Sequence, residues 1–132
     1  MTTIRPLVAL ALPLAVGLSA PVPAAKSDPL AGRVAGPPQR CIGRPGNQGP
    51  VIADEGLILY RTTGKRIWRA TVIGPCPGIR PFNTLILEVY GSQLCRNDRF
   101  RTLPPGSIIP SAYCRFGEFI PYDKVETSDQ QR

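Results

Sequence analysis

The stretch VIGPCPGIRPFNTLILEVYGSQLC, from Val72 to Cys95, contains the clearest strand pattern of the chain. In Thr84–Tyr90 (TLILEVY), the alternation would point Leu85, Leu87 and Val89 at a core and the residues between them outward. A helix is the competing interpretation because Leu and Glu are good helix formers, but the β-branched and aromatic residues of the run favour a strand. The preceding segment, GPCPGIRPFN, is rich in proline and glycine and predicts a rigid loop.

Outward from this strand, glycine and proline interrupt the chain about every ten residues, a spacing that favours short strands joined by turns. The other strands that we expect are Pro50–Ala53, Leu57–Arg61, Arg66–Val72 and Arg99–Leu103, with short edge strands in GSII (106–109) and GEFIPY (117–122). Pro110 and Pro121 would end the edge strands because proline cannot donate to a sheet ladder. The sequence therefore predicts an all-β fold, a small antiparallel barrel or curled sheet of five to seven short strands stapled by disulfides.

The N-terminal residues have the layout of a secretory signal peptide, with Arg5 before an apolar run from Leu7 to Leu18 and a small-x-small motif that ends at Ala24. A membrane anchor is disfavoured because the run is shorter than the roughly 20 residues that span a bilayer and is interrupted by Pro13. The predicted organisation is a signal peptide (1–24), a flexible leader (25–39), a disulfide-bonded β domain (40–122) and a disordered tail (123–132). The mature protein would have no transmembrane span and would be periplasmic or secreted.

The chain is basic, with 16 Lys and Arg residues against 9 Asp and Glu residues and a formal net charge of +7. Such a charge attracts anionic surfaces, but the positive residues are spread along the chain and form no dense run, as on many soluble proteins. No histidine is present. That absence excludes Ser-His-Asp and Cys-His catalysis and removes the commonest metal ligand.

The four cysteines, Cys41, Cys76, Cys95 and Cys114, are separated by 34, 18 and 18 residues. Zinc knuckles and thioredoxin-like redox sites need close cysteine pairs, which this spacing does not provide. In a small exported chain, an even number of cysteines indicates disulfides. Three connectivities exist, and the sequence alone does not select one. We favour Cys76–Cys95, closing a loop around the strand Thr84–Tyr90, and Cys41–Cys114, joining the two ends of the domain.

No specific pattern for catalysis or nucleic-acid binding is found in the chain. Paired carboxylates can cleave glycosides without histidine, but nothing marks two of the candidates as a pair; these candidates are Asp54, Glu55, Glu88, Asp98, Glu118 and Asp123. An aromatic and basic face for single-stranded nucleic acid could be formed by Tyr60, Trp68 and Phe100 with Arg61, Arg69 and Arg101. Buried aromatics and solvated arginines are the commoner arrangement. The candidate binding face comprises Arg61, Arg69, Arg99, Arg101 and Trp68. We expect no enzyme activity, no metal and no cofactor.

Five segments occur in the order CIG at Cys41, GLILYRTTGKRIWRA (56–70), CPGI at Cys76, SQLC ending at Cys95, and YCRFGEFIPY (113–122). With these segments the chain resembles an uncharacterised family of small proteobacterial proteins that carry a signal peptide and four cysteines. The resemblance covers residues 40–122, implies a periplasmic, disulfide-bonded β domain, and transfers no catalytic residue. The segment GRPGNQGP (43–50) departs from the more strand-like run of the family, which predicts a shortened first strand in this chain.

The sequence thus predicts an exported, non-enzymatic module that binds or supports a component of the cell envelope. An anionic surface is a candidate partner, and nucleic acid is disfavoured. The alternative is an exported inhibitor or effector that acts on a protein partner through a proline-stiffened loop such as Gly74–Pro81. Envelope association that weakens with salt would favour the first function, and tight one-to-one binding to a single enzyme would favour the second.

Overall fold

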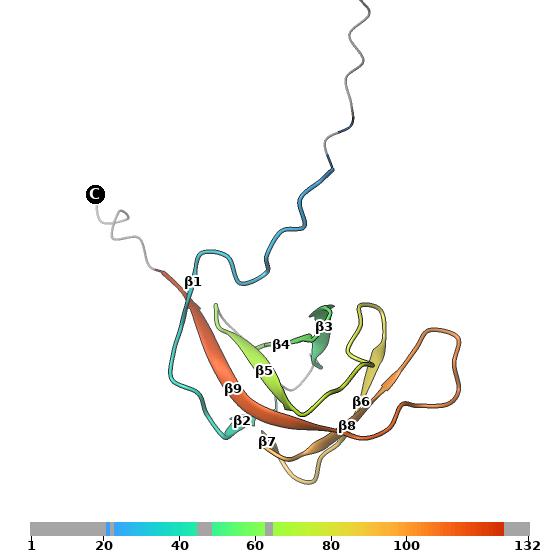
Figure 1. The fold of residues 1–132 in the computed structure, drawn as a ribbon. Coiled ribbons are helices and arrows are strands. Elements are labelled where there is room, and N and C mark those ends of the chain that lie inside the picture. The colour runs from blue at the N-terminus through green and yellow to red at the C-terminus, as the bar shows by residue number, and fades with distance from the viewer. Residues whose placement is uncertain (1–20, 22, 45–48, 63–64, 126–132) are drawn as a thin grey trace, which may run out of the picture.

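The computed structural model describes residues 21, 23–44, 49–62 and 65–125 (Figure 1). Within these ranges the strands are β1 (Arg33–Ala35), β2 (Cys41–Gly43), β3 (Val51–Asp54), β4 (Leu57–Arg61), β5 (Ile67–Ile73), β6 (Thr84–Glu88), β7 (Gln93–Cys95), β8 (Arg99–Leu103) and β9 (Cys114–Lys124). Seven of them form one antiparallel sheet in the order β3-β4-β5-β9-β8-β6, with β1 beside β9, and β2 pairs with β7. Figure 1 shows the larger sheet curled into a half-barrel. The predicted all-β class and curled sheet are confirmed.

The hydrophobic core lies inside the curl and is built around β9, the longest strand. Phe116 and Phe119 of β9 are fully buried, as is Phe100 of β8. The ring of Phe116 lies 4.3 Å from that of Phe100 and 5.8 Å from that of Phe119, measured between ring centroids. Ile58 and Tyr60 of β4 close the core from the other side of the curl. A continuous apolar interior therefore joins both ends of the sheet.

A bulge in β9 brings both of its phenylalanines into this core. The pairing between β5 and β9 shifts between Ala70 and Val72, where β9 has one extra residue. Phe116 and Phe119 are three residues apart, and the extra residue lets both side chains point inward. Gly117 lies in the bulge, where an added Cβ would overlap the hydroxyl oxygen of Thr71. That hydroxyl donates a hydrogen bond to the backbone oxygen of Glu118 (2.8 Å) and holds the bulge in place.

The strand predictions agree best with the structure where alternation is strict. β4 and β8 have the predicted bounds, and Leu85, Leu87 and Val89 pack against the core as expected. β6 ends at Glu88, two residues earlier than predicted, before the turn at Gly91, which has a positive φ of 100°. The competing interpretation of this segment as a helix is therefore wrong.

Both predicted edge strands need correction. Residues 106–109 form an exposed loop, in which the N–H of Ser107 donates to the oxygen of Pro104 (3.1 Å). The second segment, 117–122, is part of β9, which continues through Pro121 to Lys124. Pro121 has no N–H, but its carbonyl oxygen accepts a hydrogen bond from the N–H of Gly36 (2.8 Å), so the strand stays paired there.

The folded unit extends beyond both predicted boundaries of the β domain. β1 lies inside the predicted leader and pairs with the end of β9, with Ala35 opposite Tyr122 and Arg33 opposite Lys124. Asp123, placed in the predicted tail, accepts two hydrogen bonds from the guanidinium of Arg66 (2.8 and 2.7 Å). The predicted signal peptide lies outside the described residues apart from residues 21, 23 and 24.

Two buried hydroxyl groups have no hydrogen-bond partner among the described residues: those of Tyr60 and Thr102. Burial raises the pKa of the Tyr60 hydroxyl, which is therefore neutral at any physiological pH. An unpaired buried hydroxyl costs about 1–3 kcal/mol. Both groups thus lower the stability of the core that surrounds them.

Replacing Thr102 by valine or Tyr60 by phenylalanine is therefore expected to raise the free energy of unfolding by about 1 kcal/mol, because each change removes an unpaired hydroxyl and keeps the side-chain shape. Urea denaturation followed by fluorescence of the single tryptophan, Trp68, measures this. Tyr90→Phe is the matched control, since Tyr90 is 92% exposed and its substitution should change nothing. A loss of stability in both core variants would contradict the prediction.

Candidate functional site

The disulfides are Cys41–Cys95 and Cys76–Cys114, so the pairing favoured from the sequence is wrong. Cys41 lies directly opposite Cys95 in the ladder of β2 with β7, with 4.0 Å between their Cα atoms. The prediction paired Cys76 with the next cysteine in the chain and Cys41 with the last, whereas the pairing of β2 with β7 sets Cys41 opposite Cys95 and leaves Cys76 to bond with Cys114. No cysteine is free. Cys76 is a structural staple, and the two bridges indicate an oxidising, extracytoplasmic environment.

The structure distributes the residues of the predicted binding face over three strands. Trp68 is only 7% exposed and belongs to the core, with the guanidinium of Arg66 over its ring at 5.5 Å. Arg61 and Arg69 lie on β4 and β5, whereas Arg99 and Arg101 lie on β8. The strand β9 separates the two pairs. The structure therefore brings Arg99 and Arg101 together and leaves the other predicted residues apart from them.

Arg99 and Arg101 are joined by an aromatic ring that the sequence analysis did not select. Their guanidinium carbons lie 4.8 and 4.9 Å from the centroid of the Tyr113 ring, which is half exposed. Arg115, on β9, lies opposite Arg99 in the ladder and is exposed. We call Arg99, Arg101, Tyr113 and Arg115 the arginine–tyrosine patch. The signal that could have found Tyr113 is its place in the register, because the β8–β9 ladder continued by one residue sets it opposite Arg101.

Two loops leave the sheet beside this patch, at the same end of the β6–β8 pair. The first is 74–83, before β6, and the second is 104–113, after β8; the ladder pairs Thr84 with Leu103 at the point where both begin. Figure 1 shows the two loops side by side at the right of the sheet. We call them together the loop end. The disulfide Cys76–Cys114 ties the first loop to the residue that follows the second.

The loop end carries three large apolar side chains in solvent. Phe82 is 89% exposed, Ile108 is 93% exposed and Ile109 is 74% exposed. We call these three residues the apolar tip. Phe82 also has a positive φ of 73°, an uncommon conformation for a residue other than glycine, which turns the chain at this point. An exposed apolar residue alone is normal, but three at one end of a small protein mark a candidate interaction site.

The second loop is held by its own hydrogen bonds. Ser107 Oγ accepts from the N–H of Ile109 (3.2 Å) and donates to the oxygen of the same residue (3.1 Å). Arg101 Nε donates to the oxygen of Ser111 (2.8 Å), and Ser111 Oγ accepts from the N–H of Thr102 (2.9 Å). The loop is therefore a fixed projection whose base is fastened to the patch.

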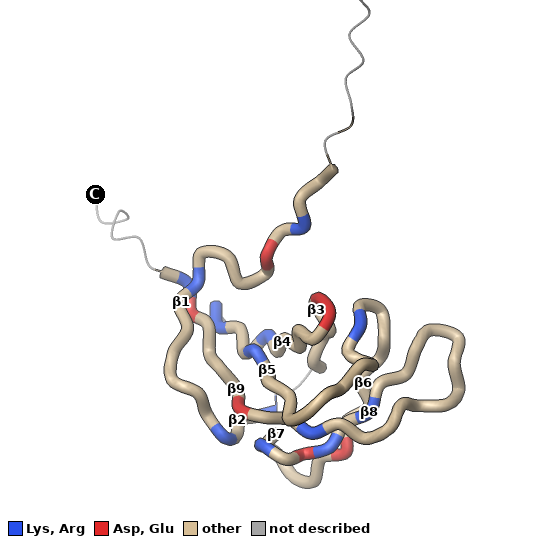
Figure 2. The backbone as a smooth tube through the Cα atoms, viewed as in Figure 1, with Lys and Arg blue, Asp and Glu red and all other residues tan. Residues whose placement is uncertain are grey.

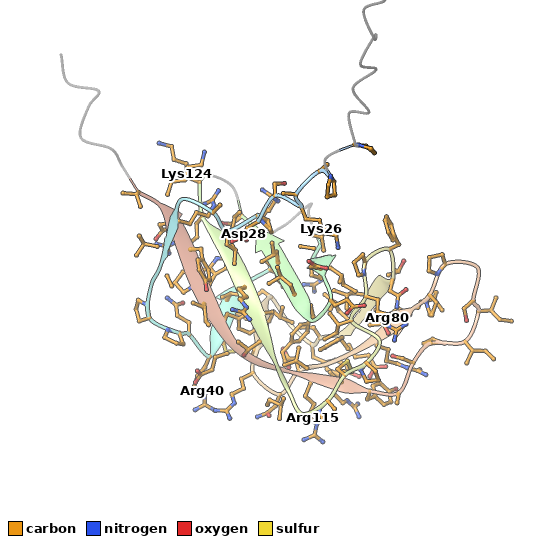
Figure 3. All side chains as sticks on the ribbon, turned by 45° about the horizontal axis from the view of Figure 1, so that its top comes forward. Lys26, Asp28, Arg40, Arg80, Arg115 and Lys124 are labelled. Atoms are coloured by element: carbon orange, nitrogen blue, oxygen red, sulfur yellow. A yellow bond between two sulfur atoms is a disulfide. The ribbon has the colours of Figure 1, made fainter. Side chains whose placement is uncertain are left out.

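Charge is unevenly placed around this end of the molecule. Neither loop contains an acidic residue. Figure 3 shows Arg80 in the first loop and Arg115 further along the lower edge of the sheet, pointing away from it. An acidic turn, formed by Asp54 and Glu55, is joined to the first loop by a backbone hydrogen bond. The N–H of Gly56, which follows these two residues, donates to the oxygen of Ile79 in that loop (3.0 Å). Figure 2 shows this acidic turn next to β3.

A groove of about 490 Å³ lies on another part of the surface, and it mixes both signs of charge. Its lining residues are Asp28, Leu30, Asp54, Glu55, Gly56, Leu57, Arg69 and Tyr122. Lys26 pairs with Asp54 across 3.5 Å at the surface. A hydrogen bond from the N–H of Glu55, with the charge of Lys26, lowers the pKa of Asp54. Arg69 of the predicted face thus lies among carboxylates, a poor place for an anionic ligand.

Four of the six carboxylates considered for catalysis, those of Asp54, Glu88, Asp98 and Asp123, are held by structural contacts. Asp98 accepts a hydrogen bond from the N–H of Cys95 (2.6 Å), and Glu88 lies 3.5 Å from the guanidinium of Arg99. The hydrogen bonds and charge of Arg66 lower the pKa of Asp123. In the described ranges, no group of three or more acidic or cysteine side chains could hold a metal ion.

Within the described part of the chain, no helix has the length and hydropathy to cross a membrane. No family model, curated protein or solved structure matches the chain. The resemblance to small proteobacterial proteins therefore stays a prediction. What is established is a small β protein in which four cysteines form two disulfides.

Proposed function

We propose that this protein is an exported, non-enzymatic binding module that docks on a component of the cell envelope through its loop end. The observation that carries the proposal is the apolar tip, Phe82, Ile108 and Ile109, projecting from two loops without acidic residues beside the arginine–tyrosine patch. Burying an isoleucine or phenylalanine side chain in a partner is worth about 1.5–3 kcal/mol. Three such residues on a fixed projection can therefore anchor the domain.

Export to the periplasm or the medium is supported by two independent features. The sequence of residues 1–24 has the layout of a cleaved signal peptide. Two disulfides with no free cysteine are typical of proteins that mature in an oxidising compartment. The intact mass of the exported protein, measured with a thiol-alkylating reagent and without a reductant, tests both features, because export predicts cleavage near Ala24 and no alkylated thiol.

A binding role is supported over catalysis by the chemistry of the side chains. The chain has no histidine, its cysteines are bridged, and Asp98 and Asp123 are engaged in structural hydrogen bonds. The loop end and the arginine–tyrosine patch combine apolar and cationic groups. Such groups can bind a partner, but they do not include the general acid and base that catalysis by proton transfer needs.

The proposal is tested by expressing the full chain in a Gram-negative host and measuring how the mature protein divides between the soluble periplasmic and envelope fractions. The wild-type protein is expected in the envelope fraction. Ile108→Ser with Ile109→Ser should move most of it to the soluble fraction, because the anchoring side chains are lost. The matched control is Val34→Ser with Val51→Ser, two valines that are 60% and 50% exposed away from the loop end.

Wild-type protein recovered in the soluble fraction would overturn the proposal, as would equal release of the control variant. The alternative function, inhibition of a protein partner through the loop Gly74–Pro81, predicts a different result. The protein would then be soluble and would form a tight one-to-one complex with one enzyme, which an Arg80→Gln substitution in that loop would weaken.

A further inference from the structure

We infer that the envelope component is the anionic lipid surface itself, and that the protein binds it peripherally with its loop end. This inference rests on the proposed function and names its partner. In the arrangement that we propose, Ile108 and Ile109 enter the boundary between lipid headgroups and acyl chains. The arginines of the patch and Arg80 then face the lipid phosphates.

The backbone of the second loop is suited to a place with little water. Pro104, Pro105 and Pro110 frame the loop and have no N–H to leave unpaired. Of the four N–H groups between them, those of Ser107 and Ile109 donate within the loop. An unpaired backbone group is costly in hydrocarbon, so a loop in which only the N–H groups of Gly106 and Ile108 remain to be satisfied enters the interface at a lower cost than an ordinary polar loop.

Charge complementarity argues for an anionic bilayer over a neutral one. Arg80 and Arg115 are exposed, and among the described residues their side chains have no ion pair or hydrogen bond. Arg99 and Arg101 both lie over the Tyr113 ring, and Arg99 also pairs with Glu88 across 3.5 Å, so these contacts partly offset the repulsion between the two like charges. Weak apolar insertion and weak electrostatic attraction together give the two signals that stable peripheral binding requires.

The acidic turn at Asp54 and Glu55 sets the orientation of docking. It contacts the first loop through the hydrogen bond from Gly56 to Ile79, and its carboxylates would be repelled by lipid phosphates. The second loop has no acidic residue close to it in the sequence, because residues 99–117 contain no Asp or Glu. We therefore expect Ile108 and Ile109 to lead and Phe82 to touch the surface from one side.

A protein partner would use the same apolar groups, but the observations favour lipid. The apolar tip consists of three exposed side chains spread over two loops with cationic side chains behind them, whereas a protein interface has a more continuous apolar centre inside a polar rim. Interfacial binding needs only shallow entry of a few side chains into a fluid surface. The protein can then recognise the lipid surface by its charge and needs no partner of complementary shape.

The test is flotation of the purified oxidised protein with vesicles of phosphatidylcholine, and with vesicles in which about a quarter of the lipid is phosphatidylglycerol. We expect binding at least about tenfold stronger to the anionic vesicles, with loss of binding in high salt. Arg80→Gln with Arg115→Gln should weaken binding about 25-fold, or about fivefold for each arginine near the surface. The matched control, Arg61→Gln with Arg69→Gln, changes the net charge equally and should weaken it less than about threefold.

A second measurement reports the depth of the second loop without depending on affinity. Ile108→Trp places an indole at the tip, and its emission should shift to the blue with anionic vesicles and be quenched by brominated acyl chains. Val34→Trp, at a position that is 60% exposed elsewhere, should show neither change. The native Trp68 is buried and contributes the same background to both variants.

Equal binding to both kinds of vesicle, or an unchanged emission of Ile108→Trp, would overturn the inference. If the protein then still fractionated with envelopes through Ile108 and Ile109, the partner would be an envelope protein or glycan, and the proposed function would stand without the lipid. Vesicle binding by a protein that stayed soluble in cells would overturn the proposed function and leave the lipid contact intact.

Discussion

Replacing Cys76 and Cys114 together by alanine is expected to lower the free energy of unfolding by about 4 kcal/mol. The bridge closes a loop of 38 residues, and the chain-entropy model gives about 4 kcal/mol for a loop of this length. Small domains have a total stability of about 5–15 kcal/mol, so this loss is a large share of it. Urea denaturation followed by Trp68 fluorescence measures the change.

The second disulfide provides a matched comparison, because Cys41 and Cys95 are separated by 54 residues. Replacing both by alanine should lower the free energy of unfolding by about the same amount. The two double variants should differ in function. Loss of Cys76–Cys114 frees the first loop from the start of β9 and should also weaken envelope binding, whereas loss of Cys41–Cys95 removes only the link between β2 and β7.

The connectivity itself can be checked by peptide mapping of the oxidised protein without reduction. Peptides that contain Cys41 should be joined to peptides that contain Cys95, and those with Cys76 to those with Cys114. A link between Cys76 and Cys95 would contradict the structure. A loss below about 1 kcal/mol in both double variants would contradict the argument that the bridges staple a thin core.

The strands that sequence could predict are those in which side-chain alternation decides burial. Phe100 and Thr102 share one face of β8 and are both fully buried, as the period of two requires. Strands of three residues carry no such period. β1 in the proline-rich N-terminal segment and β2, which begins at Cys41, were beyond prediction, because their place depends on the partner strands β9 and β7.

The same reason explains what was missed in the candidate site. Arg99 and Arg101 could be selected from the sequence as outward residues of one strand. Tyr113 could not, because its position between them follows from the pairing of β8 with β9. The disulfide connectivity failed likewise, since the order of strands in the sheet differs from their order in the chain. Local patterns report which face a residue occupies, and topology decides its neighbours.

Phe116→Ala is expected to have the largest effect of any single substitution in the core, a loss of about 3–5 kcal/mol in the free energy of unfolding. Phe116 is fully buried, stacks at 4.3 Å on Phe100, and lies 5.8 Å from Phe119. Truncation would leave a cavity between β8 and the bulge of β9, and the hydrogen-bonded strands around it can collapse only in part to fill it.

Phe82→Ala is the control that separates burial from residue type. The same ring is removed, but Phe82 is 89% exposed, so the free energy of unfolding should change by less than about 0.5 kcal/mol. Envelope binding should respond in the opposite way, falling in Phe82→Ala and remaining unchanged in the fraction of Phe116→Ala that stays folded. Similar losses of stability in both variants would mean that Phe82 is packed in solution, and the loop end could then no longer be an exposed binding surface.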